Sequence, residues 1–171
     1  STFGLAYLLQ EVMPALRREM QGYRFEVPII GDGAPVEPLR RYLKQENLHL
    51  RGYVDDLDSE LYDSDVFLFL NNAGPFRAIF SRQIISWAMG LCLVAHAGSR
   101  DAMPELAHGE NALIGSTPEE LSKLVKRACL DSELNEKLRR GGRASFKENF
   151  SPLALSKKLI SLMEDVISQR G

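Results

Sequence analysis

The sequence predicts a doubly wound α/β fold, in which helices cover both faces of a parallel sheet. Short apolar runs of strand size alternate with helix-sized segments through the first two thirds of the chain. The runs are continuously apolar rather than alternating, which is typical of strands that helices bury on both faces. Strands in this βαβα order lie parallel and are joined by right-handed crossovers.

Five apolar runs are expected to be strands, at residues 25–31, 48–54, 66–70, 92–96 and 111–115. The helices expected around them cover residues 5–20, 36–45, 57–63, 81–90 and 101–107. Pro28 suits an edge strand, because proline cannot donate to a sheet ladder. Since residue 1 already leads into a helix, we expect the first strand of such a fold to lie outside this chain.

From residue 117 onward the sequence predicts only helices. Thr117, Pro118 and Glu120 have the spacing of a capping box with proline at the first helical position. A second helix should open at Ser132 and stop or break at the glycine pair 141–142. A third should open at residues 151–152 and carry a broad apolar stripe: Leu153, Leu155, Leu159, Ile160, Leu162, Met163, Val166 and Ile167.

Composition suits one soluble globular domain of 171 residues, with 44% hydrophobic and 26% charged residues. A net charge of −2 disfavours a general nucleic-acid binder, which carries a basic excess. The longest apolar run is too short to span a membrane, and no export signal is visible. Cys92 and Cys129 form no C-x-x-C pair, so we expect reduced thiols in a cytoplasmic protein, free or peripheral at the inner membrane face.

Gly31, Asp32 and Gly33 follow a strand and precede a helix, where a phosphate-cradling turn would lie. The dinucleotide-binding fingerprint is incomplete, because Val36 occupies its third glycine position. A Walker loop is excluded because no Gly-Lys-Ser/Thr follows. The pattern alone favours a phosphate turn and a plain tight turn equally.

Metal and hydrolase motifs are incomplete as well. The acidic run at residues 55–65 lacks the glycine and glutamate of a calcium loop, which Leu61 and Phe67 replace. It is better explained as a helix start with acids near the positive end of the dipole. The three histidines share no ligand spacing, and no Gly-x-Ser-x-Gly elbow occurs. His96 follows a strand at the ligand-facing edge, where a lone histidine is more often structural than catalytic.

An ordered series of short motifs runs through nearly the whole chain, at residues 4–5, 29–33, 50–57, 61–70, 88–95, 104–106, 109–113, 118–121, 142–143 and 149–151. Each motif is weak alone, but their order is specific. The series resembles the C-terminal, nucleotide-sugar-binding domain of GT-B-fold glycosyltransferases of the group 1, family 4 type. The resemblance implies one Rossmann-like donor-binding domain over residues 1–171, with the N-terminal acceptor domain outside this chain.

The resemblance also implies a donor nucleotide-sugar site at the carboxyl ends of the strands, without a metal or other cofactor. The diphosphate would meet the amino end of the helix near Ser81, with Arg82 as a phosphate contact. The residues expected at the donor are Gly31, Asp32, Gly33, Tyr53, Val54, Arg77, Ser81, Arg82 and Gln83. No catalytic residue is assigned, because the missing domain is expected to supply most of the catalytic side chains.

Three positions depart from the family pattern. Arg77 and Ile85 stand where the family has two glutamates, and Phe3 stands where it has a diphosphate-gripping lysine. Two functions therefore stay open. In the first, the chain is the donor half of a transferase that moves a hexose from a nucleoside-diphosphate sugar to a glycan, lipid or other acceptor, and is inactive alone. In the second, it is a degenerate domain kept for binding or assembly without catalysis.

Overall fold

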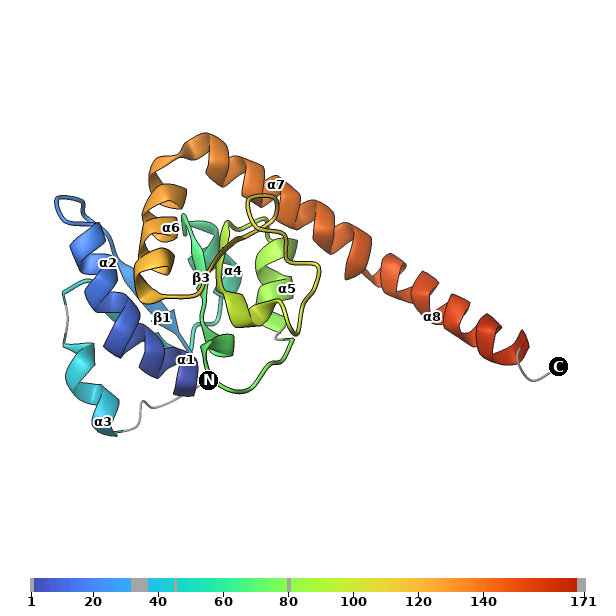
Figure 1. Ribbon diagram of the computed structural model, residues 1–171, viewed down its shortest axis with the longest axis horizontal. Helices are drawn as coiled ribbons and strands as arrows, with labels where there is room; N and C mark the ends of the chain where they lie inside the picture. The colour runs from blue at the N-terminus through green and yellow to red at the C-terminus, as the bar shows by residue number, and fades with distance from the viewer. Residues whose placement is uncertain (1, 32–36, 45, 80, 169–171) are drawn as a thin grey trace.

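The computed structural model describes residues 2–31, 37–44, 46–79 and 81–168 (Figure 1). It opens with a continuous helix made of α1 (Thr2–Tyr7), a π-helical turn η1 (Leu8–Val12) and α2 (Met13–Glu19). The Met13 N–H reaches back to the Leu8 carbonyl and so closes the wider turn. Pro14 is the next residue and has no N–H to donate, which explains why the helix departs from regular α-helical hydrogen bonding at this point.

The strands form two parallel segments in the described part of the chain. β1 (Val27–Ile30) pairs with β2 (Leu48–Gly52), and β3 (Phe67–Phe69), β4 (Leu93–His96) and β5 (Leu113–Gly115) follow one another in a second segment. All five predicted strands are confirmed, each shorter than its apolar run. The α/β class with parallel strands is confirmed too, although one sheet was expected and the strands described here form two separate segments.

Short helices connect the strands: α3 (Glu37–Arg40), η2 (Arg41–Leu43), α4 (Leu57–Tyr62), η3 (Asn71–Ala73), α5 (Ser81–Ala88) and η4 (Ala97–Ser99). The acidic helix start expected near residue 56 is confirmed. The Asp56 carboxylate accepts from the Ser59 N–H at 3.0 Å and caps α4.

The helix predicted at residues 101–107 is wrong, since the structure has turns there. Pro104 has no backbone N–H to donate, and hydrogen bonds to the Asn111 side chain replace the backbone bonds that a helix would form. Its amide donates to the Glu105 carbonyl at 2.8 Å and accepts from the Ala107 N–H at 2.8 Å. The apolar residues that suggested a helix are instead buried from a turn, with Met103 fully buried.

Three helices close the chain: α6 (Pro118–Leu130), α7 (Ser132–Asn149) and α8 (Pro152–Ser168). The capping box of α6 is confirmed, with Thr117 Oγ1 accepting from the Glu120 N–H at 3.2 Å. The expected break at residues 141–142 is wrong, because α7 continues through both glycines. A side chain at Gly141 would collide with the Glu110 carbonyl, and one at Gly142 with the Trp87 ring, so close packing explains this pair.

Helices cover the three-stranded segment on both faces, as a doubly wound fold requires. Successive residues of a strand point to opposite faces. Val94 joins a core cluster with α2 and α6, whereas Leu93 and Ala95 join a second cluster that includes Trp87 of α5. Figure 1 shows α2 and α6 side by side, and residues of both helices belong to the first cluster.

The last helix is an exception to this packing. α8 extends away from the other elements in Figure 1, and none of its residues from 152 to 168 is buried. The expected apolar stripe is therefore present but unpacked, with Leu159 60% exposed and Ile167 70% exposed. Within the described residues, no helix has both the length and the apolar character needed to cross a bilayer.

Candidate functional site

The parallel strands bring their carboxyl ends to one edge of each segment, the edge where open α/β sheets bind ligands. β1 ends at Ile30 and β2 at Gly52. The N–H of Gly31 donates to the Gly52 carbonyl at 2.8 Å and so joins these two ends. Both glycines have positive φ angles, 139° and 67°, which other residues rarely adopt. Glycine is thus required at both turns.

The loop after β3 is held in place by a buried side chain, Asn72. Its Nδ2 donates to the Ala78 carbonyl at 3.0 Å, and its Oδ1 accepts from the Ala78 N–H at 3.2 Å. This pair of bonds fixes the loop directly before α5. We did not predict Asn72 as a site residue, and the available signal was a polar asparagine pair immediately after a buried strand.

The amino end of α1 packs against the same loop. A Cβ at Gly4 would lie 2.6 Å from Asn71 Oδ1, and a Cβ at Gly74 would lie 3.2 Å from the Phe3 ring. The approach at Gly4 is too tight for a larger side chain, and a side chain at Gly74 would require the Phe3 ring to move by a few tenths of an ångström. Two helices, α1 and α5, therefore begin at the carboxyl end of β3, and Phe3 covers the loop at the position where the family pattern has a lysine.

Arg77 is tied to the protein by most of its donors. Its Nε donates to Asp101 Oδ2 at 3.1 Å, and its Nη1 donates to the carbonyls of Gly74 and Phe76. The guanidinium also lies against Gly98, where a Cβ would come within 2.7 Å of Nε. Arg77 thus fastens the loop after β3 to the turn after β4. Asp101 was not predicted, and its separation of 24 residues from Arg77 left no signal in the sequence.

The amino end of α5 combines two exposed side chains with a buried one. Ser81 and Arg82 are exposed, whereas Gln83 is fully buried. Among the described residues, neither Nε2 nor Oε1 of Gln83 has a hydrogen-bond partner. A buried amide left unpaired costs about 1–3 kcal/mol, so such groups in native proteins commonly mark a place for water or a ligand. The N–H groups of the first helical turn are also free of helical partners.

His96, at the end of β4, is held at both ring nitrogens. Nδ1 accepts from the Gly98 N–H at 3.1 Å, which leaves the proton on Nε2 to donate to the Ser116 carbonyl at 3.2 Å. The Tyr7 ring lies edge-on to the imidazole, with 5.7 Å between the two ring centroids. Burial lowers the pKa of His96 below its usual value, against the opposing effect of its backbone hydrogen bonds. This neutral, fully bonded imidazole acts as a structural tie, in agreement with the structural interpretation of a lone histidine.

The predicted donor residues fall into two groups along this edge. The first follows β1 and β2 and comprises Gly31, Tyr53 and Val54. The second follows β3 and comprises Arg77, Ser81, Arg82 and Gln83. Asp32 and Gly33 lie outside the described residues. Tyr53 is 74% exposed, and among the described residues no hydrogen bond joins the two groups. Ile85 is partly exposed, with an apolar side chain where the family has an acid.

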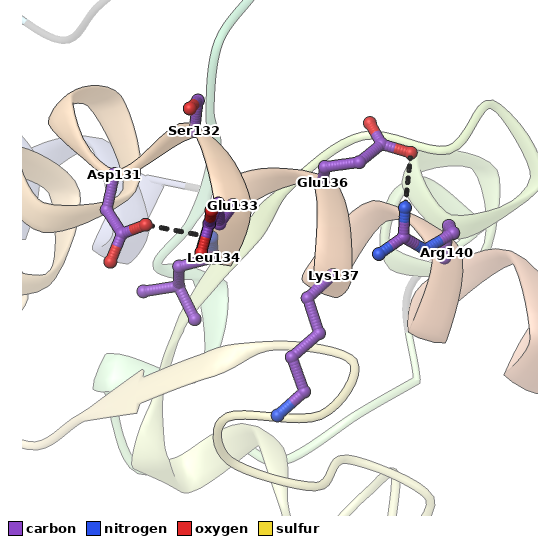
Figure 2. Close-up of a pocket in the computed structure, with 7 residues that line it drawn as sticks. All are labelled: Asp131, Ser132, Glu133, Leu134, Glu136, Lys137 and Arg140. Atoms are coloured by element: carbon purple, nitrogen blue, oxygen red, sulfur yellow. Dashed lines mark hydrogen bonds and ion pairs between the residues drawn. The ribbon is translucent and has the colours of Figure 1, made fainter.

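A surface hollow of about 630 Å³ lies elsewhere, at the start of α7 (Figure 2). It is lined by Asp131, Ser132, Glu133, Leu134, Glu136, Lys137 and Arg140. The dashed lines in Figure 2 mark the bonds of two of its three acids: Asp131 caps the Leu134 N–H at 2.9 Å, and Glu136 pairs with Arg140 at 3.4 Å. None of the predicted donor residues lines it. The described residues also contain no group of three His, Cys, Asp or Glu side chains placed to hold a metal.

The fold is similar to halves of larger solved proteins. HepE of Anabaena in complex with UDP superposes with a TM-score of 0.79 at 14% identity, over 96% of this chain and 46% of HepE. A glycosyltransferase of Rickettsia africae gives 0.70 at 16% identity, over 98% and 45%. Sucrose-phosphate synthase of Thermosynechococcus elongatus gives 0.69 at 17% identity, over 94% and 43%. This chain thus spans less than half the length of each.

Sequence comparison identifies the family. No curated protein matches the chain. The family model described as glycosyl transferases group 1 matches residues 2–131, well over half of the sequence. This match agrees with the resemblance of the ordered motifs and with the fold of the solved structures. The chain therefore belongs to the group 1 glycosyl transferases.

Proposed function

We propose that this chain is the nucleotide-sugar-binding part of a glycosyltransferase that moves a hexose from a nucleoside-diphosphate sugar to a glycan, lipid or other acceptor. The observation that carries the proposal is the amino end of α5, where the buried, unpartnered Gln83 amide lies in the first turn. Two further findings support it. The family is that of group 1 glycosyl transferases, and HepE, which shares the fold, has been solved with UDP and with UDP-glucose.

The diphosphate would bind at the start of α5. Free N–H groups and the positive end of the helix dipole make such a terminus a favourable place for phosphates. Arg82 is exposed beside it and offers a planar set of donors, and the Ser81 hydroxyl adds another. The Gln83 amide would bond to a polar group of the donor and so satisfy its unpaired atoms. The proposal includes no metal, because the helix end and Arg82 supply the positive charge.

The nucleoside would lie toward the ends of β1 and β2. Gly31 and Gly52 bring the backbone turns together there, and the exposed Tyr53 ring lies directly after them. Val54 belongs to the same loop, and Asp32 and Gly33 belong to the turn after β1. An aromatic ring and close backbone turns suit the flat face of a base and the hydroxyls of a ribose. Arg77 would border this space at the loop after β3.

The acceptor would be held by a part of the full-length protein that is not in this chain. Structures with the same fold are more than twice as long, so this chain would form one side of a cleft. We therefore expect no transfer activity from it alone. We also place the protein in the cytoplasm, where the free thiols Cys92 and Cys129 would stay reduced.

A second function, a degenerate domain that binds or assembles without catalysis, is favoured by one observation. Arg77 occupies a position where the resemblance implies a glutamate, and most of its donors are already used by Asp101 and loop carbonyls. Such an arginine stabilises the loop and offers little to a sugar. Ile85 likewise cannot accept hydrogen bonds from hydroxyl groups.

Calorimetric titration with UDP, GDP and ADP, and with their sugar conjugates, separates the two functions. The donor-site proposal predicts that one diphosphate binds and shifts the NMR signals of residues 31, 52–54 and 81–83. Arg82→Ala should weaken that binding roughly 10- to 100-fold, the effect of losing a hydrogen bond to a charged group. Arg127→Ala, at the far end of α6, is the matched control and should leave affinity unchanged. Absence of binding by every nucleotide would favour the degenerate domain.

Gln83 allows a sharper test, because stability and affinity should change in opposite directions. Gln83→Leu replaces an unpaired buried amide with an apolar group of similar size. The free protein should become more stable by about 1 kcal/mol, while affinity for the nucleotide falls. Thermal melts and calorimetry measure the two effects. A loss of stability in the ligand-free variant would show that the amide serves the fold, and would remove Gln83 from the site.

A further inference from the structure

The turn after β4 carries an exposed acid, Asp101, beside the loop that precedes α5. Its Oδ2 accepts from Arg77 Nε at 3.1 Å, and no hydrogen bond to its Oδ1 occurs in the described part of the chain. The Asp101 side chain is 68% exposed, against 34% for Arg77. Residues 66–100 include no Asp or Glu, so the fold brings a carboxylate to a loop that has none of its own. One oxygen of Asp101 is thus open to a ligand at this edge.

Stability does not account for this acid. An ion pair with so exposed a carboxylate contributes little to the free energy of unfolding, because water screens it. Arg77 is also held without Asp101, since its Nη1 donates to the carbonyls of Gly74 and Phe76 and its guanidinium lies against Gly98. The arginine is therefore the fixed partner, and it orients the carboxylate rather than depending on it.

Asp101 lies on the β4 side of the start of α5. β3 pairs with β4, and Arg77 precedes Ser81, the first residue of α5, by four positions. The loop between them is held by the two hydrogen bonds that join Asn72 to Ala78. A donor that lay along this edge would have its nucleoside at the ends of β1 and β2 and its diphosphate at α5. Its sugar would then reach the turn that carries Asp101.

We propose that Asp101 is a specificity-determining residue of the donor site, whose Oδ1 accepts a hydrogen bond from a hydroxyl group of the sugar. The inference rests on the proposed function, which places the diphosphate at the start of α5. A carboxylate forms a short, charge-assisted bond with a hydroxyl, and one that is already oriented loses less freedom on binding. The same charge repels a sugar that carries a carboxylate of its own. The site therefore selects neutral hexoses over uronic acids.

Calorimetric titration of the full-length protein with UDP, UDP-glucose and UDP-glucuronate tests this assignment. Asp101→Asn keeps an oxygen that can accept from Arg77 but removes the charge. It should weaken the binding of UDP-glucose about 10-fold and leave that of UDP unchanged, because only the sugar reaches Asp101. The original protein should prefer UDP-glucose to UDP-glucuronate, and the variant should lose about 10-fold of that preference. Where GDP or ADP is the diphosphate that binds, it is compared with its sugar conjugate in the same way.

Glu136→Gln is the matched control. Glu136 is a similarly exposed acid that pairs with an arginine, Arg140, but it lies in α7 and away from the candidate donor residues. Its substitution removes one negative charge and should leave all three affinities unchanged. Thermal melts should show that both variants are as stable as the original protein, since each loses only an exposed ion pair.

Three results would overturn the proposal. Equal losses of affinity for UDP and UDP-glucose in Asp101→Asn would show that Asp101 acts through the loop rather than on the sugar. Unchanged affinities for both would remove Asp101 from the site. A marked loss of stability would show that the carboxylate serves the fold. Failure of the proposed function has a different signature, because no nucleoside diphosphate would then bind to the original protein, and this inference would fall with it.

Discussion

The two sheet segments arise from similar apolar runs but differ in burial. In β4, Leu93, Val94 and Ala95 have no exposed surface, whereas Leu50 of β2 is 47% exposed. The difference follows from the number of neighbours rather than from the residues themselves. β4 has a strand on each side and helices on both faces. In β4 the apolar run is buried along its length because a strand or a helix covers each of its four sides.

The β1–β2 segment is buried on one face only. Val27 and Leu48, which face each other in register, point toward the cluster beneath α2. On the opposite face Pro28, His49 and Arg51 are exposed. This face of the segment is therefore largely exposed in the described structure. The comparison predicts that stability resides in the three-stranded segment.

Trp87→Ala should test that conclusion with the largest effect. The indole is fully buried beneath the three-stranded segment, donates from Nε1 to the Asn111 carbonyl at 2.9 Å, and packs against Phe150. Its loss should lower the free energy of unfolding by about 3–5 kcal/mol. Urea unfolding followed by circular dichroism measures this loss. Tryptophan fluorescence cannot be used, because Trp87 is the single tryptophan and the variant lacks it.

Tyr62→Ala is the matched aromatic control, because Tyr62 is 76% exposed. It should change the free energy of unfolding by no more than about 0.5 kcal/mol. Equal losses in the two variants would contradict the assignment of the core to the face that Trp87 covers.

Ile29→Ala should have a smaller effect in the two-stranded segment. Its half-buried side chain predicts a loss of about 1–2 kcal/mol, against about 2–5 kcal/mol for Leu93→Ala in the buried segment. Denaturant unfolding of both variants gives the ratio. Equal losses at Ile29 and Leu93 would contradict the difference in burial between the two segments.

The sequence predicted those parts of the fold whose cause is local. Apolar runs located all five strands, and Thr117 with Glu120 located the start of α6. The errors arose where tertiary contacts override local preference. The glycines at 141 and 142 looked like a helix break, but they allow Glu110 and Trp87 to approach α7. Residues 101–107 have a helical pattern in the sequence, but in the structure backbone groups of this segment form hydrogen bonds with the Asn111 side chain instead.

The candidate site was predictable only in part, for a similar reason. Its position at the carboxyl ends of parallel strands follows from strand order alone. The ion pair of Arg77 with Asp101 and the buried state of Gln83 depend on segments brought together by folding. A motif assigns Arg77 to the donor site. The structure adds that its side chain already fastens a loop, which spacing along the chain could not show.

Removal of α8 should have the smallest effect on stability, because none of its described side chains is buried against the rest of the chain. A chain that ends at Ser151 loses no buried side chain among the described residues 152–168, so its free energy of unfolding should stay within about 0.5 kcal/mol of the original. A chain that ends at Gly141 is the contrasting truncation. It removes the half of α7 whose Phe146 packs against the core beneath α5, so it should be strongly destabilised. Thermal melts compare the two. A marked loss in the first truncation would mean that the apolar face of α8, rather than standing free, folds back onto the body of the chain.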